Sequence, residues 1–195
     1  MSDRLLVATT NAGKLAEIAR QLEGAPVALL SLADLPPIPE PEEHGATFAE
    51  IARDKARHYA RASGLTTVAE DSGLEIDALD GAPGILSARF PGATYPDKFA
   101  RIFSMLDERG ARDSTARFVC ALAVARGGEI LFEAEGRVEG RITREPRGSG
   151  GFGYDPILYY PPCGRTLAEV SAEEKAAVSH RGQAFRALRA WLTRE

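Results

Sequence analysis

The chain has 195 residues, of which 44% are apolar and 27% charged, and this composition predicts one globular domain over residues 1–195 with a substantial core. Its net charge of −4 argues against extensive nucleic-acid binding, although it is compatible with a local basic pocket. Cys120 and Cys163 lie far apart and form neither a Cys-x-x-Cys motif nor a disulfide framework. No signal peptide or membrane-spanning apolar run is visible, so we expect a cytoplasmic protein without a membrane partner.

A polar turn separates the first predicted strand from the first predicted helix. Residues 4–9 are typical of a buried strand, and apolar residues recur at helical spacing over 15–22. Asn11 is a natural N-cap, and Lys14 falls in the first turn, where a cation opposes the helix dipole. Backbone N–H groups beside a lysine suit a phosphate; the alternative is a solvated surface lysine. The spacing is not that of a Walker A motif.

A proline-rich loop follows a second predicted strand at residues 26–30. Residues 35–45 contain four prolines and cannot form a regular element. Three acids lie in this loop, Glu43 among them. Solvent is the usual environment of such acids, and a ligand site is the alternative.

A long helix is predicted from Thr47 to about Ala62. Thr47 and Glu50 form a capping box at its start, and apolar residues follow at helical spacing. Lys55 lies at the edge of the apolar stripe. Its side chain would either extend to water or reach into a cleft.

Two adjacent carboxylates, Glu70 and Asp71, follow a β-type run at residues 65–69. Acids at the end of a buried strand are costly unless a cation or hydrogen-bond donors meet them. The Ser-Gly dipeptide that comes next predicts a turn before a second alternating run at 74–79. This stretch is therefore either a functional site or a turn in which Asp71 bonds its own backbone.

The middle of the chain predicts a helix and a hairpin. Apolar spacing indicates a helix that ends near Gly110, and residues 115–125 and 129–142 have strand patterns. The Gly-Gly pair between these two strands is typical of a hairpin turn.

Residues 148–153 match the Gly-x-Gly-x-x-Gly pattern of dinucleotide-binding loops. The Tyr-Asp-Pro that follows prevents the helix which that motif requires, so we reject the dinucleotide interpretation. Such a loop can still approach a base closely, and Phe152 either stacks on that base or belongs to the core.

Two helices are predicted near the end of the chain. Ser171 and Glu174 form a capping box for a short helix that carries Lys175. His180 and Arg181 stand at the start of the last helix, where they oppose its dipole.

Five separated stretches together resemble the non-canonical purine nucleoside triphosphate pyrophosphatases, the inosine triphosphate pyrophosphatase or Ham1-like family. They span nearly the whole chain in the family's order and lie at residues 9–14, 45–50, 70–74, 148–156 and 179–184. One departure is that Glu50-Ile51-Ala52 stands where the family usually has Glu-Asn-Ala. Helical spacing makes Ile51 a core residue, whereas the family pattern has a polar group there.

The resemblance implies a mixed α/β fold, with a long central mixed β-sheet flanked by helices and two lobes that enclose the active-site cleft. It also implies a homodimer that uses Mg²⁺ to hydrolyse ITP, dITP and XTP to the monophosphate and pyrophosphate, and so cleanses the nucleotide pool. The expected partner is therefore a small nucleotide and not a nucleic acid.

The resemblance also implies roles for individual residues. Asp71 would prime the attacking water, and Glu43 and Asp71 would bind Mg²⁺. The triphosphate would be held by Thr9, Thr10, Asn11, Ala12, Gly13 and Lys14, with Lys55 nearby and Ser72 touching the substrate. The base and sugar would contact Phe152, Gly153, Tyr154, Asp155, Lys175, His180 and Arg181. Donors such as Arg181 or backbone N–H groups would select a 6-keto purine.

Two other classes of protein are compatible with the sequence. One is a related phosphohydrolase, such as a Maf-like pyrophosphatase that acts on modified pyrimidines. The other is a nucleotide-binding protein without turnover, which the replacement at Ile51 makes conceivable. A panel of nucleoside triphosphates assayed for pyrophosphate release separates these classes.

Overall fold

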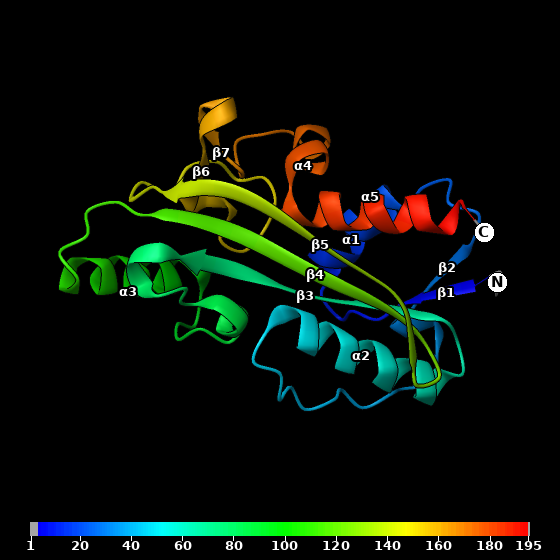
Figure 1. Ribbon diagram of the computed structural model, residues 1–195. Helices are drawn as coiled ribbons and strands as arrows, with labels where there is room; N and C mark the ends of the chain where they lie inside the picture. The colour runs from blue at the N-terminus through cyan, green and yellow to red at the C-terminus, as the bar shows by residue number, and fades with distance from the viewer. Residues whose placement is uncertain (1–3, 195) are drawn as a thin grey trace. The chain divides into compact units, whose positions relative to one another are not determined.

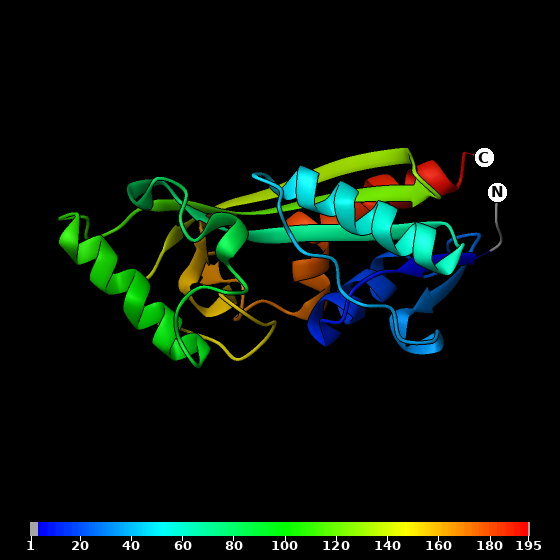
Figure 2. The same ribbon diagram turned by 90° about the horizontal axis from the view of Figure 1, so that it is seen from below.

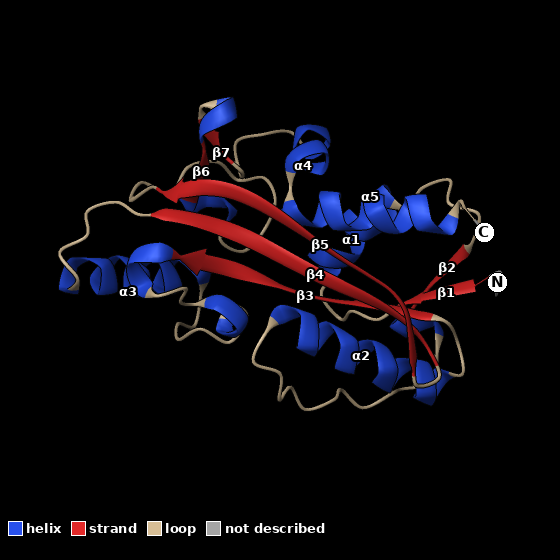
Figure 3. Ribbon diagram, viewed as in Figure 1, coloured by secondary structure: helices blue, strands red, loops and turns tan. Residues whose placement is uncertain are grey.

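The computed structural model describes residues 4–194, which adopt the mixed α/β fold that the resemblance implies (Figures 1 and 3). Within these residues one seven-stranded sheet has the order β2-β1-β3-β4-β5-β6-β7. The strands are β1 (Arg4–Val7), β2 (Ala28–Ser31), β3 (Thr67–Ile76), β4 (Thr115–Arg126), β5 (Glu129–Ile142), β6 (Leu158–Tyr160) and β7 (Arg165–Thr166). The α-helices are α1 (Ala12–Gln21), α2 (Phe48–Ser63), α3 (Tyr95–Glu108), α4 (Ala172–Val178) and α5 (His180–Leu192). No helix among residues 4–194 has the length and apolar composition needed to span a membrane.

The chain forms two compact units. The first unit contains the described residues up to Asp71, then Cys120–Gly136 and the residues from His180 onward. The second unit contains Ser72–Val119 and Arg137–Ser179. The resemblance implies two lobes, and the two units match that expectation; a single domain and the position of the cleft stay predictions.

The sheet of the first unit has helices on both faces. β1 pairs in parallel with β2 and with β3, where Leu6 lies opposite Thr67 and Val7 opposite Val68. Helices α1 and α5 pack on one face with Val68, and α2 packs on the other face with Ala69. Seen from below, α2 lies in front of these strands and α5 behind them (Figure 2). Alternate residues of β3 therefore point to different helices.

Helix caps that were predicted from the sequence fix where these helices begin. The Asn11 side chain accepts a hydrogen bond from the backbone N–H of Lys14 at 3.0 Å. Thr47 and Glu50 exchange both hydrogen bonds of the predicted capping box at the start of α2. Gly64 ends α2 with a φ of 70°, a left-handed conformation that glycine adopts without steric cost.

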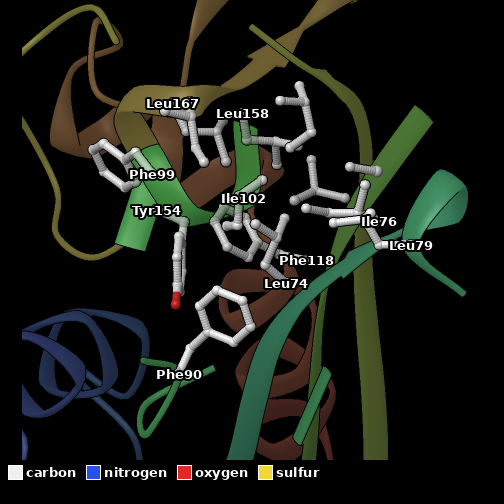
Figure 4. Packing of buried hydrophobic residues seen from close by; sticks show 14 of the residues in the cluster. Leu74, Ile76, Leu79, Phe90, Phe99, Ile102, Phe118, Tyr154, Leu158 and Leu167 are labelled. Carbon is white, nitrogen blue, oxygen red and sulfur yellow. The ribbon is translucent and has the colours of Figure 1, made fainter. Parts of the chain in front are cut away.

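The second unit has its own apolar core, in which Phe90, Phe99, Phe118 and Tyr154 lie among aliphatic side chains (Figure 4). Phe99 of α3 and Tyr154 belong to this core, and their ring centroids lie 6.0 Å apart. The Tyr154 hydroxyl donates a hydrogen bond of 2.8 Å to the backbone carbonyl of Ser87. Tyr154 is therefore held at both its ring and its hydroxyl, which anchors the loop that precedes it.

Two sequence expectations about strands were wrong or incomplete. The Ser-Gly dipeptide after Asp71 forms no turn, because β3 continues through it as one strand from Thr67 to Ile76. The turn alternative for Asp71 is thereby excluded. Strands β6 and β7 were not predicted, since segments of three and two residues are too short to show an alternating pattern.

Candidate active site

One lysine and two carboxylates from three elements meet in the first unit. The Nζ of Lys55, on α2, lies 3.0 Å from Oδ1 of Asp71, on β3. The same Nζ forms an ion pair with Oε1 of Glu43, in the proline-rich loop. We name these residues the Lys55 cluster. The structure thus brings together both predicted metal ligands, although they are 28 positions apart in the sequence.

Burial sets the electrostatics of the Lys55 cluster. Burial raises the pKa of the Asp71 carboxyl, while the nearby charges of Lys55 and Lys14 oppose that shift. Burial also acts to lower the pKa of Lys55, but Asp71 and Glu43 outweigh it, so the net shift is upward and the ammonium is retained. Two carboxylates and one ammonium carry a net charge of −1 when all are ionised. The cluster is therefore electrostatically suited to a further cation.

The chemistry of the Lys55 cluster fits Mg²⁺. This ion binds hard oxygen ligands and commonly uses one or two carboxylates, with waters and phosphate oxygens completing its shell. Glu43 and Asp71 supply two carboxylates that converge on one ammonium. Residues 4–194 contain no group of three or more His, Cys, Asp and Glu side chains placed to hold a metal.

Glu70 and Asp71 lie on opposite faces of the sheet because neighbouring strand residues alternate. Asp71 has the parity of Ala69 and faces α2, whereas Glu70 has the parity of Val68 and faces α1 and α5. The adjacent acids therefore form no carboxylate pair, although their sequence positions suggest one.

A second group of charges surrounds Glu70, and we name Lys14, Glu17, Glu70 and Arg181 the Glu70 cluster. Oε1 of Glu70 lies 2.9 Å from Nζ of Lys14 and 3.3 Å from Nη2 of Arg181. The other side of the guanidinium contacts Glu17 through Nη1 at 2.5 Å. Burial acts to lower the pKa of Arg181, but the partners of the guanidinium, Glu70 first among them, together outweigh burial and the net shift is upward. Arg181 is thus a buried, permanently charged group within this cluster.

The predicted phosphate-binding residues lie in the loop after β1 and in the first turn of α1: Thr9, Thr10, Asn11, Ala12, Gly13 and Lys14. This loop follows the carboxyl end of a strand that runs parallel to its neighbours, where α/β proteins commonly bind ligands. The Thr9 hydroxyl accepts the Asn11 N–H at 3.2 Å, and the Thr10 hydroxyl donates to Glu40 at 3.0 Å. First-turn N–H groups have no partner within their own helix, so this turn offers donors to an anion.

His180 and Arg181 form the first turn of α5, as the sequence predicted. Strand β5 approaches this turn closely at Gly136, where an added Cβ would lie 2.1 Å from the backbone carbonyl oxygen of His180. Only glycine leaves room for this contact. A contact between either of these two residues and a base stays a prediction.

The remaining predicted contacts gather in the second unit around Asp155. Oδ2 of Asp155 lies 2.6 Å from Nζ of Lys175 and accepts the backbone N–H of Phe152 at 2.7 Å. The Lys175 ammonium also lies 5.0 Å from the centroid of the Phe152 ring. Gly151 permits this arrangement, because a Cβ there would lie 2.1 Å from Oδ2 of Asp155. Phe152 therefore lies beside the Lys175–Asp155 ion pair. Both Phe152 and its neighbour Gly153 are half-buried.

The sequence interpretation missed two contributors to the first unit's charged groups, Glu17 and Cys120, and gave Glu70 no role of its own. Glu17 contacts Arg181, Cys120 lies 3.6 Å from Glu70, and Glu70 itself joins two cations. Helical spacing could have placed Glu17 on the same side of α1 as Lys14, three residues earlier. No local signal could have revealed the contact with Arg181, which is 164 positions away. Ser72, also predicted to touch the substrate, is half-buried on β3 in the second unit.

Comparisons with known proteins agree with the resemblance found in the sequence. A model of the Ham1 family matches residues 5–191. A dITP/XTP pyrophosphatase of Geobacter sulfurreducens is 47% identical over 188 residues, which cover 95% of this chain and 94% of that protein. A protein of the same name from Shigella flexneri is 44% identical over 189 residues, with 95% of each chain covered. The solved structure of a HAM1 protein from Coxiella burnetii superposes with a TM-score of 0.92 at 40% identity and covers all of both chains. Since these similarities extend along nearly the whole sequence, the chain belongs to the Ham1 family.

Proposed function

We propose that this protein hydrolyses the non-canonical purine nucleoside triphosphates ITP, dITP and XTP to the monophosphate and pyrophosphate with Mg²⁺, and so cleanses the nucleotide pool. The observation that carries the proposal is the convergence of Glu43 and Asp71 on Lys55 in a member of the Ham1 family. Relatives from Geobacter sulfurreducens and Shigella flexneri bear the name dITP/XTP pyrophosphatase, which supports this substrate class.

Asp71 is the proposed general base of the reaction. Its buried carboxylate takes a proton from the water that attacks the α-phosphorus, and pyrophosphate leaves. Burial raises the pKa of the Asp71 carboxyl, while the charges of Lys55 and Lys14 oppose that shift. Mg²⁺, when bound by Glu43 and Asp71, supplies neutralisation of phosphate charge. Phosphoryl transfer depends mainly on positioning the reactants and neutralising phosphate charge. The first unit supplies carboxylates that would hold the metal ion and lysines that would neutralise phosphate charge.

The phosphate chain is assigned to the loop after β1 and to two lysines. The first turn of α1 offers backbone N–H donors at the positive end of the helix dipole. Lys14 and Lys55 add positive charge from α1 and α2. A triphosphate is the most highly charged part of the substrate, so these cations and backbone donors are the groups in the first unit that suit it.

Base selection is assigned to Arg181 and His180, together with Phe152 and its neighbours in the second unit, as the resemblance implies. A 6-keto purine accepts hydrogen bonds where adenine would present a donor against protein donors. We therefore propose that ITP and XTP exceed ATP in kcat/KM by a wide margin, and GTP by a smaller one, because guanine shares the 6-keto group. A homodimer and a cytoplasmic location belong to the same proposal.

Pyrophosphate release from ITP, XTP, dITP, GTP and ATP tests this function, with methylated pyrimidine triphosphates in the same panel. The expected result is rapid release from ITP, dITP and XTP that requires Mg²⁺ and is lost in Asp71→Asn. Preference for methylated pyrimidines would instead identify a Maf-like activity. Tight ITP binding without pyrophosphate release would identify a nucleotide-binding protein.

A further inference from the structure

Glu70 is among the most deeply buried charged groups of the first unit, with a side chain only 1% exposed. Its Oε1 is shared by two cations that come from different helices. Nζ of Lys14 lies 2.9 Å from this atom, and Nη2 and Nε of Arg181 lie at 3.3 and 3.4 Å. Oε2 lies 3.6 Å from Sγ of Cys120, on β4.

A carboxylate in this environment is costly unless cations remain beside it. Because Lys14 and Arg181 share one oxygen, a displacement of either changes the hydrogen bonding of the other. The arrangement couples α1, which carries the proposed phosphate loop, to the first turn of α5. The proposed reaction gives Glu70 itself no chemical step, since it faces away from the Lys55 cluster.

We propose that Glu70 is a positioning residue that holds Lys14 and Arg181 in one arrangement, so that phosphate binding and base selection depend on the same carboxylate. This inference rests on the proposed function, in which Lys14 contacts phosphate and Arg181 contacts the base. Lys14 has an 18% exposed side chain and can reach a ligand while Glu70 holds it. In the Arg181 guanidinium, Nε and Nη2 face Glu70 and Nη1 faces Glu17.

Glu17 provides a matched control, since it contacts the same guanidinium. Glu17→Gln removes a carboxylate that meets Nη1 of Arg181 at 2.5 Å. This variant leaves unchanged the Oε1 atom of Glu70, which Lys14 and Arg181 both contact. Glu70→Gln removes the charge at that shared oxygen and keeps nearly the same shape. The two variants therefore separate an effect on Arg181 from an effect on both cations.

The experiment measures binding of a non-hydrolysable ITP analogue and of inosine monophosphate in the presence of a chelator, and the ITP-to-ATP ratio of kcat/KM with Mg²⁺. We define the triphosphate advantage as the affinity for the ITP analogue divided by the affinity for inosine monophosphate. In Glu70→Gln we expect this ratio to fall roughly 10- to 100-fold, the range for losing a hydrogen bond to a charged group. The ITP-to-ATP ratio should fall in the same variant. Glu17→Gln should lower that ratio and keep the triphosphate advantage.

Three results would overturn the inference. The first result comes from Mn²⁺ binding, measured in place of Mg²⁺ binding without nucleotide. If Glu70→Gln weakens Mn²⁺ binding as much as Asp71→Asn does and leaves nucleotide binding intact, Glu70 is a metal ligand. If it lowers only the melting temperature, its role is structural. If it changes only one of the two nucleotide measurements, it does not couple them. A wild-type protein that releases no pyrophosphate from ITP, dITP or XTP refutes the proposed function instead, and the binding measurements still test Glu70.

A second measurement does not require Glu70 to be replaced, in case Glu70→Gln fails to fold. Lys14→Met, Arg181→Lys and the double variant form a cycle around the unchanged carboxylate. We expect the loss of ITP kcat/KM in the double variant to be clearly smaller than the product of the two single losses, because both side chains act through one oxygen. A double loss equal to that product contradicts the coupling.

Discussion

The replacement Ile51→Asn introduces the residue that the family resemblance implies at this position, and we expect it to destabilise this protein. Ile51 is 1% exposed and lies on the buried stripe of α2. Its Cγ1 lies 2.8 Å from the place that a Cβ on Gly45 would occupy, so its side chain packs against the backbone of the loop that carries Glu43. The side chain therefore links the helix of Lys55 to the loop of Glu43.

The structure sets the magnitude of this effect. Full burial of an isoleucine side chain contributes about 1.5–3 kcal/mol. A buried amide left without a partner costs about a further 1–3 kcal/mol. The free energy of unfolding should therefore fall by at least about 2.5 kcal/mol in Ile51→Asn. Ile51→Val, which keeps an apolar contact, should lose only about 0.5–1.5 kcal/mol.

Urea unfolding of the wild type and both variants measures this difference, and pyrophosphate release per folded molecule is measured in parallel. We expect no gain in ITP turnover for Ile51→Asn, because the side chain it replaces supports the Glu43 loop. Unchanged stability would refute the packing argument and show that an asparagine finds a hydrogen-bond partner here. Unchanged stability with higher turnover would show that isoleucine costs this protein activity.

Three further predictions concern individual side chains. Asp71→Asn should lower ITP turnover by roughly 10²- to 10⁴-fold, the range for losing a general base; near-normal turnover of a folded variant, judged by circular dichroism, would remove Asp71 from that role. Lys14→Ala should weaken binding of a non-hydrolysable ITP analogue much more than binding of inosine monophosphate, and an equal effect on both ligands would argue against a phosphate contact. Burial, reinforced by the charge of Glu70, raises the pKa of the Cys120 thiol well above its usual range, whereas Cys163 is partly exposed. A thiol reagent at pH 8 should therefore modify one cysteine in the native protein and both in guanidinium, and rapid modification of Cys120 in the native state would contradict its burial.

Local sequence signals predicted the helix starts and the hairpin. Asn11, Thr47 and Ser171 cap helices where expected, because each cap forms within four residues of the chain. The Gly127-Gly128 pair separates β4 from β5 for the same reason. The resemblance to a family supplied the mixed sheet, whose strand order involves pairings too distant for local patterns to predict.

The features that sequence reasoning missed depend on contacts between distant segments. The Ser-Gly dipeptide after Asp71 has a local preference for turns, but β3, which lies next to β4 in the sheet, remains extended through it. The different surroundings of Glu70 and Asp71 were also invisible. They depend on which face of the sheet each helix covers, and that arrangement is set by the fold as a whole.

The alternation of β3 has a consequence for how this strand can change in evolution. Register pairs Thr67 with Leu6 and Val68 with Val7, and counting onward from these pairs directs Glu70 toward α5 and Asp71 toward α2. Inserting one residue between Val68 and Glu70 would exchange the destinations of the two acids, while inserting two would restore them. Odd changes in length at this point should therefore abolish activity by directing Asp71 away from Lys55, whereas even changes keep each acid on its own face but move it roughly 6.6 Å along the strand for every two residues.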